Sequence, residues 1–324
     1  MSEAGIIAGI LWLALTAYAV LAGADFGGGV WDLFASGPRA REQRQAVAEA
    51  MGPVWEANHV WLIFMITGFF TAFPSEFAVL SLDLYLPFTI ALVGIVLRGA
   101  SFAFRAHARE AVGGPSAWGV AFGTASVIAP FFLATGIGSV AVGLSPTSWA
   151  SPYSLLIGVF AVAMCAYLAA TYLTVETEGT ALEADFRRRA MVAGLVSGVV
   201  AIVCLLLAPI AAPNLAHALL GRGLPLVILA LINGPVALAA VWRSRPRIAR
   251  VAVAGQVVLV LWAWAVGQWP YLIPNVTIDS AAAPSSTLDG LLVVISVGML
   301  LLIPSLAVLF RVFKARNPAA VDKA

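Results

Sequence analysis

Charged residues are scarce in this sequence. Its 324 positions hold 18 Lys and Arg and 16 Asp and Glu, whereas 61% of the residues are hydrophobic and the mean hydropathy is +0.97. Such a composition lies far from that of soluble domains and indicates an integral membrane protein. Charge-free stretches of about 18 residues or more are typical of membrane-spanning helices. Nine such stretches occur, at residues 5–24, 57–74, 77–97, 118–142, 152–175, 190–212, 224–242, 251–271 and 291–310.

Cysteine and histidine are scarce as well. Cys165 and Cys204 have no spacing for a disulfide framework or a metal site, so we expect them to be small buried apolar residues. The three histidines are not paired across two spans at a matching depth, which argues against a bis-histidine haem site. A single axial ligand at His59 stays an alternative to the polar or proton-handling histidine that we favour. Residues 27–29 (GGG) lack the GK[ST] ending of a phosphate loop and indicate close helix packing or a break.

Positive charge is confined to alternate loops. The loops after the odd-numbered stretches and the C-terminal tail hold 17 of the 18 Lys and Arg, and the other loops hold only Arg222. The positive-inside rule therefore predicts an external N-terminus and a cytoplasmic C-terminus. A net charge of +2, spread over these loops, gives no case for nucleic-acid binding. The first stretch has spanning length without a preceding basic region, so we expect it to be retained rather than cleaved as a secretion signal.

The predicted fold class is all-α, a single polytopic membrane domain over residues 1–324 with no soluble domain in its connections. We expect spans one to four and five to eight to form two packed four-helix bundles, with the ninth helix at the periphery. Residues 39–51 are rich in charge and predict a short helix along the cytoplasmic surface.

Ionisable side chains near the membrane interior are costly and mark candidate functional sites. Asp25 follows the first apolar stretch, Glu56 and His59 open the second, and Arg98 closes the third, so all four lie near the cytoplasmic end. Glu56 and His59 share a helix face, and Asn58 adds a polar link between them. This group suits proton intake from the cytoplasm. A salt-bridge cluster, in which Arg98 neutralises Asp25 or Glu56 and pins helices together, explains it equally well.

Two further features flank this group. Asp32 lies seven residues after Asp25 and shares its face if the helix continues through residues 27–29, although three glycines weaken a helix there. Trp55 and Trp61 stand on either side of the polar residues, where shaping the site and simple packing both remain open.

Short motifs interrupt the apolar sequence at recognisable intervals. They are residues 23–29 (GADFGGG), 52–62 (GPVWEANHVWL), 70–74 (FTAFP), 97–105 (LRGASFAFR) and 268–274 (QWPYLIP), the last followed by Thr277, Ile278 and residues 281–287. In order and spacing these motifs resemble subunit II of the cytochrome bd quinol oxidases. The likeness covers about residues 10–313 and agrees with nine helices. It is most specific at residues 55–62, and the middle spans match only as apolar helices.

The sequence departs from the pattern of that family at four positions. An acid is usual where Ala22 stands and frequent where Ala103 stands, whereas Glu56 is commonly Asp and His59 is commonly Glu or Gln. Because Asp25 and a carboxylate at Glu56 remain, the resemblance still allows a proton route, whose groups need not be the usual ones.

The resemblance implies a subunit of a quinol-oxidising, oxygen-reducing complex in the prokaryotic cytoplasmic membrane. The partner, subunit I, is expected to carry haems b and d, to oxidise quinol on the external side and to reduce oxygen with cytoplasmic protons, moving charge without pumping. This chain would stabilise that partner and hold no haem or metal, with room for a structural quinone or lipid; small accessory subunits stay open. Matched motif by motif, the expected proton-intake residues are Asp25, Glu56 and His59, and the supporting residues are Trp55, Asn58 and Arg98.

Two rival functions remain. A proton-coupled secondary transporter also has many spans and few buried acids, but it would place a polar substrate site at mid-membrane between broken helices. Here the ionisable groups gather at one end, which favours the oxidase subunit. In a purely structural membrane subunit, Asp25, Glu56 and Arg98 would only hold helices together.

Overall fold

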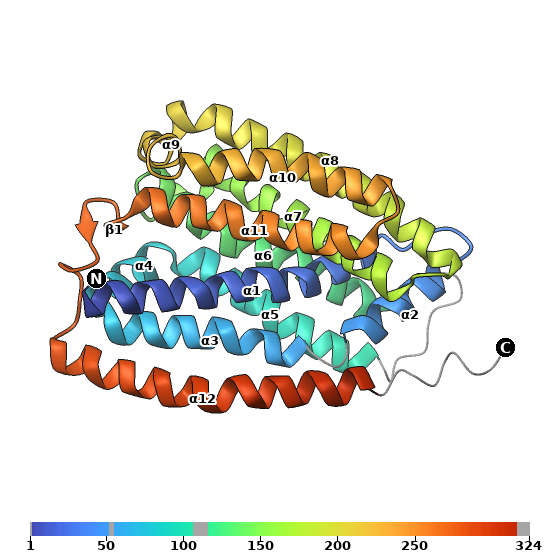
Figure 1. Ribbon diagram of the computed structural model, residues 1–324, viewed down its shortest axis with the longest axis horizontal. Coiled ribbons are helices and arrows are strands. Elements are labelled where there is room, and N and C mark those ends of the chain that lie inside the picture. Colours follow the sequence, from blue (N-terminus) through green and yellow to red (C-terminus); the bar gives the residue numbers. More distant parts are fainter. Residues whose placement is uncertain (1, 52–54, 106–115, 316–324) are drawn as a thin grey trace.

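The computed structural model describes residues 2–51, 55–105 and 116–315, except for the side chains of residues 55–57 and 309–315. Long helices lie roughly parallel to one another, with a two-stranded antiparallel hairpin at one end (Figure 1). The elements are α1 (Glu3–Leu33), α2 (Ala40–Met51), α3 (Trp55–Ala72), α4 (Pro74–Asp83), α5 (Tyr85–Arg105), α6 (Ala117–Val142), the 3-10 turn η1 (Ser148–Ala150), α7 (Pro152–Glu176), α8 (Ala181–Ala211), α9 (Pro213–Leu220), α10 (Leu224–Trp242), α11 (Pro246–Gln268), β1 (Tyr271–Ile273), β2 (Val276–Thr277) and α12 (Ser285–Ala315).

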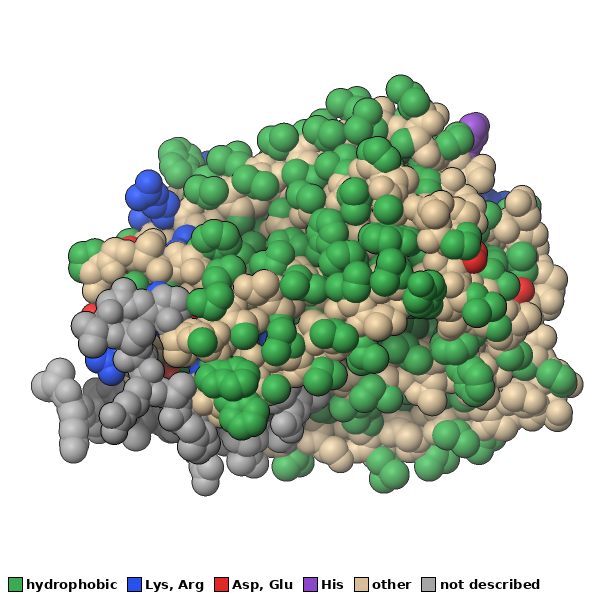
Figure 2. All heavy atoms as spheres, turned by 180° about the vertical axis from the view of Figure 1, so that it is seen from behind, with side chains coloured by type: hydrophobic (Ala, Val, Ile, Leu, Met, Phe, Trp, Pro, Cys, Tyr) green, Lys and Arg blue, Asp and Glu red, His purple; other side chains and the backbone are tan. Residues whose placement is uncertain are grey.

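Eight of the described helices are long and apolar enough to cross a membrane. The number rises to nine if α3 and α4, which are bent by 120° relative to each other, count as one span. Hydrophobic side chains cover the middle of the face in Figure 2, and Lys and Arg side chains gather mainly at the end that carries α2. The predicted all-α membrane protein is thereby confirmed.

The helix expected across residues 77–97 is interrupted, so that part of the prediction was wrong. Helix α4 ends at Asp83, and α5 begins two residues later, beyond Leu84. Pro87 lies in the first turn of α5, and its ring would clash with the carbonyl of Asp83 in a continuous helix. Pro74 occupies the first turn of α4, where a missing N–H costs nothing. Hydropathy does not register Pro87, which is why the prediction missed the break between α4 and α5.

Hydroxyl side chains cap the N-termini of four helices. Ser2, Ser116, Ser151 and Thr180 precede α1, α6, α7 and α8, and each accepts a hydrogen bond from a backbone N–H of the first turn. With this cap α8 begins at Ala181, nine residues before the apolar stretch predicted for it.

Helix α1 lies at the centre of the packing. It contacts α3, α6 and α7, while α7 also packs on α8 and α11, and α12 lies beside α1 and α3 (Figure 1). At the end with the hairpin, the hydroxyl of Ser2 donates to the carboxylate of Asp279 at 2.5 Å and ties the segment after β2 to the start of α1. Every helix that forms the candidate site described below therefore contacts α1 or a neighbour of it.

The α1 helix continues without a break through residues 27–29, so the glycines serve close packing. A Cβ at Gly27 would lie 1.8 Å from the main-chain oxygen of Cys165 on α7, and one at Gly28 would lie 2.3 Å from the sulfur of Met51. A Cβ at Gly29 would lie 2.0 Å from the hydroxyl oxygen of Ser126 on α6. Met51 belongs to α2, which confirms the short helix predicted over residues 39–51. Glycine thus lets three helices approach α1 closely.

We predict that Gly27→Ala lowers the thermal stability of the purified chain. The added methyl group meets backbone on α7, which cannot rotate away, and overpacking of this kind costs about 1–3 kcal/mol. Gly9→Ala on the same helix is the matched control, because a Cβ there meets nothing within 4 Å. An unchanged melting temperature for Gly27→Ala would contradict the close approach of α1 and α7.

Candidate functional site

Four buried polar residues meet between α1, α3, α5 and α6, and we refer to them as the Asp25–Arg98 cluster. Asp25 on α1, Asn58 on α3, Arg98 on α5 and Ser126 on α6 have relative exposures of 6%, 4%, 1% and 0%. Three of them were expected from the sequence to lie together, and the structure brings them together. Ser126 was not expected, because a serine within an apolar stretch carries no signal of its own.

Arg98 is held by neutral oxygen atoms and aromatic faces. Its Nη2 donates to the main-chain oxygen of Asp25 at 3.1 Å, and its Nε donates to the hydroxyl of Ser126 at 3.1 Å. That hydroxyl donates in turn to the main-chain oxygen of Phe122 at 2.8 Å. The guanidinium carbon lies 5.2 Å from the ring centroids of both Phe26 and Phe122, within the range of cation–π attraction.

The carboxylate of Asp25 is bound from a different direction. The side-chain amide of Asn58 donates to Oδ2 of Asp25 at 2.5 Å, so a neutral group from α3 holds the acid. Asn58 was expected to link Glu56 with His59, and in the structure it links α3 to α1 instead. In the described residues, Arg98 makes no salt bridge with the carboxylate of Asp25 and binds the main-chain oxygen of that residue instead.

His59 lies beside the cluster, against aromatic rings of α1. Its ring is half-buried, with centroids 5.9 Å from Tyr18 and 6.0 Å from Phe26. Phe26 therefore touches both the imidazole of His59 and the guanidinium of Arg98.

Two expected site residues cannot be placed in this geometry. The backbones of Glu56 and Trp55 belong to the first turn of α3, but their side chains lie outside the described residues. Asn58 and His59 follow Glu56 directly on the same helix, so its backbone lies within one turn of the cluster. Among the described residues, no group of three or more His, Cys, Asp and Glu side chains is arranged to hold a metal ion.

A second buried charge pair lies beyond the cluster along α1. Asp32 is fully buried, and its Oδ1 accepts from Nη2 of Arg105 on α5 at 3.0 Å. The guanidinium of Arg105 lies 5.3 Å from the ring of Phe122, the ring that Arg98 also contacts. Because α1 continues through its glycines, Asp25 and Asp32 stand two turns apart. Arg98 of α5 contacts the main chain of Asp25, whereas Arg105 of α5 binds the carboxylate of Asp32. The sequence analysis did not predict Arg105 as the partner of Asp32.

This fold and its buried charges define a polytopic helical membrane protein. Its central helix, α1, carries two buried acids, Asp25 and Asp32, toward one end of the molecule. Within that class, the sequence model of the family described as cytochrome bd terminal oxidase subunit II matches residues 4–313. The chain belongs to this family. The resemblance inferred from the motifs is therefore confirmed, and the family is one of subunits of oxidoreductases.

Named relatives agree with this assignment. The Bacillus subtilis cytochrome bd ubiquinol oxidase subunit 2 is 28% identical over 218 residues, which is 62% of each chain. The Escherichia coli cytochrome bd-I ubiquinol oxidase subunit 2 is 28% identical over 218 residues, 61% of this chain and 55% of that protein. These matches thus span less than two thirds of the length of either relative. A chain in the structure of bd oxidase from Geobacillus thermodenitrificans is similar in fold, with a TM-score of 0.81 and 23% identity over 97% of this chain and 99% of that chain.

We predict that Arg105→Gln destabilises the folded chain by about 3–5 kcal/mol, because it leaves the buried carboxylate of Asp32 without its cation. The matched control is Arg247→Gln, which breaks an exposed pair with Glu178 at 3.6 Å and should cost less than about 1 kcal/mol. Denaturation of both variants in the same detergent measures the difference. Equal losses would show that burial of the Asp32–Arg105 pair contributes nothing.

Proposed function

We propose that this chain is the haem-free subunit II of a quinol:oxygen oxidoreductase of the cytochrome bd type. It stabilises a haem-bearing subunit I and takes in protons from the cytoplasm for the reduction of oxygen to water. Haems b and d belong to subunit I, which oxidises quinol on the external side. Because the protons for oxygen reduction come from the cytoplasm, their inward movement separates charge across the membrane without pumping. Family membership and the names of the relatives support the overall assignment.

The observation that carries the proton role is the buried carboxylate of Asp25 at the end of the molecule where Arg and Lys gather. An acid buried to this degree in a membrane protein is costly unless it is used or paired. Its hydrogen bond comes from the neutral amide of Asn58, which can bind the acid in its charged form and, with a small change of geometry, in its protonated form. Asp25 can therefore gain and lose a proton without disrupting the helix contacts around it.

The route that we propose runs from the cytoplasm past Glu56 and His59 to Asp25, with Trp55, Asn58 and Arg98 in supporting roles. Glu56 and His59 stand within one turn of Asn58 on α3, and imidazole is the side chain best suited to relay protons near neutral pH. The fixed charge of Arg98 keeps an electrostatic balance beside the acid and holds α5 and α6 against α1.

We also propose the finer topology. The chain crosses the prokaryotic cytoplasmic membrane nine times with its N-terminus outside and its C-terminus in the cytoplasm, as two four-helix bundles with α12 at the periphery. The α3–α4 pair would count as a single, bent span in this scheme. A structural quinone or lipid is accommodated in the complex, and small accessory subunits are compatible with it.

The primary test is to express the chain with the membrane protein encoded beside it and to purify the complex through a tag on this chain. We expect a reduced-minus-oxidised visible spectrum with bands of haems b and d, together with quinol-dependent oxygen uptake. A stable, colourless preparation without a haem-bearing partner would reject the oxidase assignment and favour a transporter.

We predict that Asp25→Asn slows quinol-dependent oxygen uptake at least about tenfold, because the amide cannot carry a proton, and loss of a positioned proton-transfer group has effects of this size or more. The haem content per complex should be unchanged, since asparagine keeps the shape of the side chain and an acceptor for Asn58.

The matched control is Glu49→Gln, which neutralises an exposed carboxylate on α2 and should leave oxygen uptake unchanged. Full turnover by Asp25→Asn, with normal haem content, would assign Asp25 to a purely structural role. Glu56→Gln, tested in the same way, examines the preceding group of the route.

A further inference from the structure

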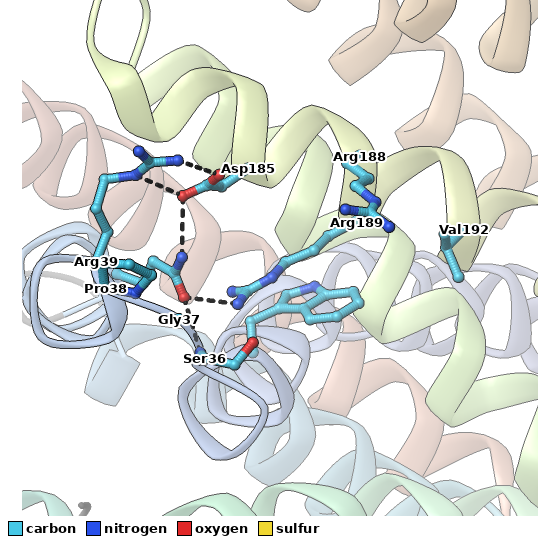
Figure 3. Close-up of a pocket in the computed structure, with 10 residues that line it drawn as sticks. Ser36, Gly37, Pro38, Arg39, Asp185, Arg188, Arg189 and Val192 are labelled. Carbon is cyan, nitrogen blue, oxygen red and sulfur yellow. Dashed lines mark hydrogen bonds and ion pairs between the residues drawn. The ribbon is translucent and has the colours of Figure 1, made fainter. Parts of the chain in front are cut away.

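A cavity of about 480 Å³ lies between α8 and the segment that joins α1 to α2. Its volume is within the range of small-molecule sites. The cavity is separate from the Asp25–Arg98 cluster, and no role in the proposed oxidase function requires it. Figure 3 shows Arg39 reaching Asp185 from the α1–α2 side, while Arg188 and Arg189 extend from α8. The joining segment turns at Gly37, whose φ of 76° favours glycine over other residues.

The cavity lining has more positive than negative charge. The single acid, Asp185, is already engaged: Arg39 binds both of its oxygens, at 2.6 and 3.0 Å, and the amide of Gln43 donates to it at 3.0 Å. Hydrogen bonding to Asp185 raises the pKa of the Arg39 guanidinium above its ordinary value, so this pair stays charged. Among the described residues, neither Arg188 nor Arg189 makes a hydrogen bond or ion pair with a carboxylate, although Arg189 lies within electrostatic range of Asp185.

Arg189 is fixed in place. It donates to Oε1 of Gln43 at 2.7 Å and to the main-chain oxygen of Phe34 at 3.2 Å, and its guanidinium carbon lies 5.3 Å from the ring of Trp31. Its Nη1 is buried and has no hydrogen-bond partner in the part of the chain that the structure describes. Arg188 is exposed, and it makes no hydrogen bond or ion pair with the described residues. One arginine is thus preorganised and the next is free to close over an anion.

An apolar ridge continues from the cavity along α8. Val192 lines the cavity itself and is 53% exposed. Residues spaced three or four apart follow it on the same face, and they are Val196, Val199, Val203 and Leu206, with exposures of 46%, 61%, 37% and 69%. The cavity and the ridge together would fit a ligand with two parts. Its anionic group would bind the arginines, and its hydrocarbon would lie along the ridge.

We propose that this cavity binds the phosphate headgroup of an anionic phospholipid, with Arg188 and Arg189 as its cationic ligands and the acyl chains along the ridge of α8. Guanidinium groups bind phosphate oxygens in pairs of charge-assisted hydrogen bonds. The adjoining hydrocarbon ridge favours a lipid over a soluble phosphate, which would use the arginines alone. The site depends only on the membrane location of the chain and does not rest on the proposed oxidase function.

The test uses native mass spectrometry of the full-length chain, together with any proteins that co-purify, titrated with palmitoyl-oleoyl phosphatidylglycerol or phosphatidylcholine. We expect tighter binding of phosphatidylglycerol by the unaltered chain. Arg188→Gln should weaken it about fivefold, the effect of one arginine near an anionic lipid surface, and should leave phosphatidylcholine binding unchanged. Arg188→Lys should bind phosphatidylglycerol with an affinity between those of the unaltered chain and Arg188→Gln, because lysine keeps the charge but cannot donate a pair of parallel hydrogen bonds.

Arg243→Gln is the matched control, since it removes one exposed arginine from the α10–α11 turn at the same end of the molecule. An equal loss with this variant would overturn the site in favour of diffuse attraction to surface charge. Unchanged phosphatidylglycerol binding by Arg188→Gln would also overturn it. Inorganic phosphate is added as a competitor: displacement of the lipid at a modest excess would identify a soluble anion as the ligand and reject the lipid.

Discussion

A guanidinium group enclosed by helices must have its donors satisfied, and the contacts of Arg98 join α5 to α1 and α6. With 1% exposure, Arg98 would be strongly destabilising without acceptors. It obtains them from the backbone of α1 at Asp25 and from Ser126 on α6, and its guanidinium group also lies over the rings of Phe26 and Phe122. One side chain from α5 therefore requires α1 and α6 to stay close, and Asn58 adds α3 to the same arrangement.

The glycines of α1 make this arrangement sterically feasible. Any side chain at Gly29 would occupy the position of the Ser126 hydroxyl, which is the acceptor for Nε of Arg98. Gly27 similarly allows the backbone of α7 to approach. The glycine run and the buried arginine are far apart in the sequence, but they support the same packing. The glycines let the helices approach closely enough to bring neutral acceptors to Arg98, and the hydrogen bonds of Arg98 stabilise the closely packed helices.

The sequence predicted much of this organisation and missed specific parts. Asp25, Asn58 and Arg98 could be expected to meet because each brings a polar group to the same end of an apolar stretch. Ser126 and Phe122 could not, since such residues are common within membrane helices. The Asp32–Arg105 pair was obscured because three glycines weaken a helix locally, whereas tertiary packing keeps α1 intact. The division between α4 and α5 was missed because a hydropathy window averages over Pro87, although the proline itself was a usable signal.

The contacts of Asp25 and Arg98 differ from those of a structural ion pair, and this difference is consistent with the proton role proposed for Asp25. In the described part of the chain, the hydrogen bonds of Arg98 go to neutral oxygens, and the carboxylate of Asp25 receives its bond from a neutral amide. If the carboxylate were the main acceptor for Arg98, protonation would leave the guanidinium unsatisfied and would loosen three helices. Because backbone and hydroxyl acceptors hold the arginine instead, Asp25 can change its protonation state while the packing around it persists. Asp32 differs, since it binds Arg105 directly, and its charge is committed to holding α1 against α5.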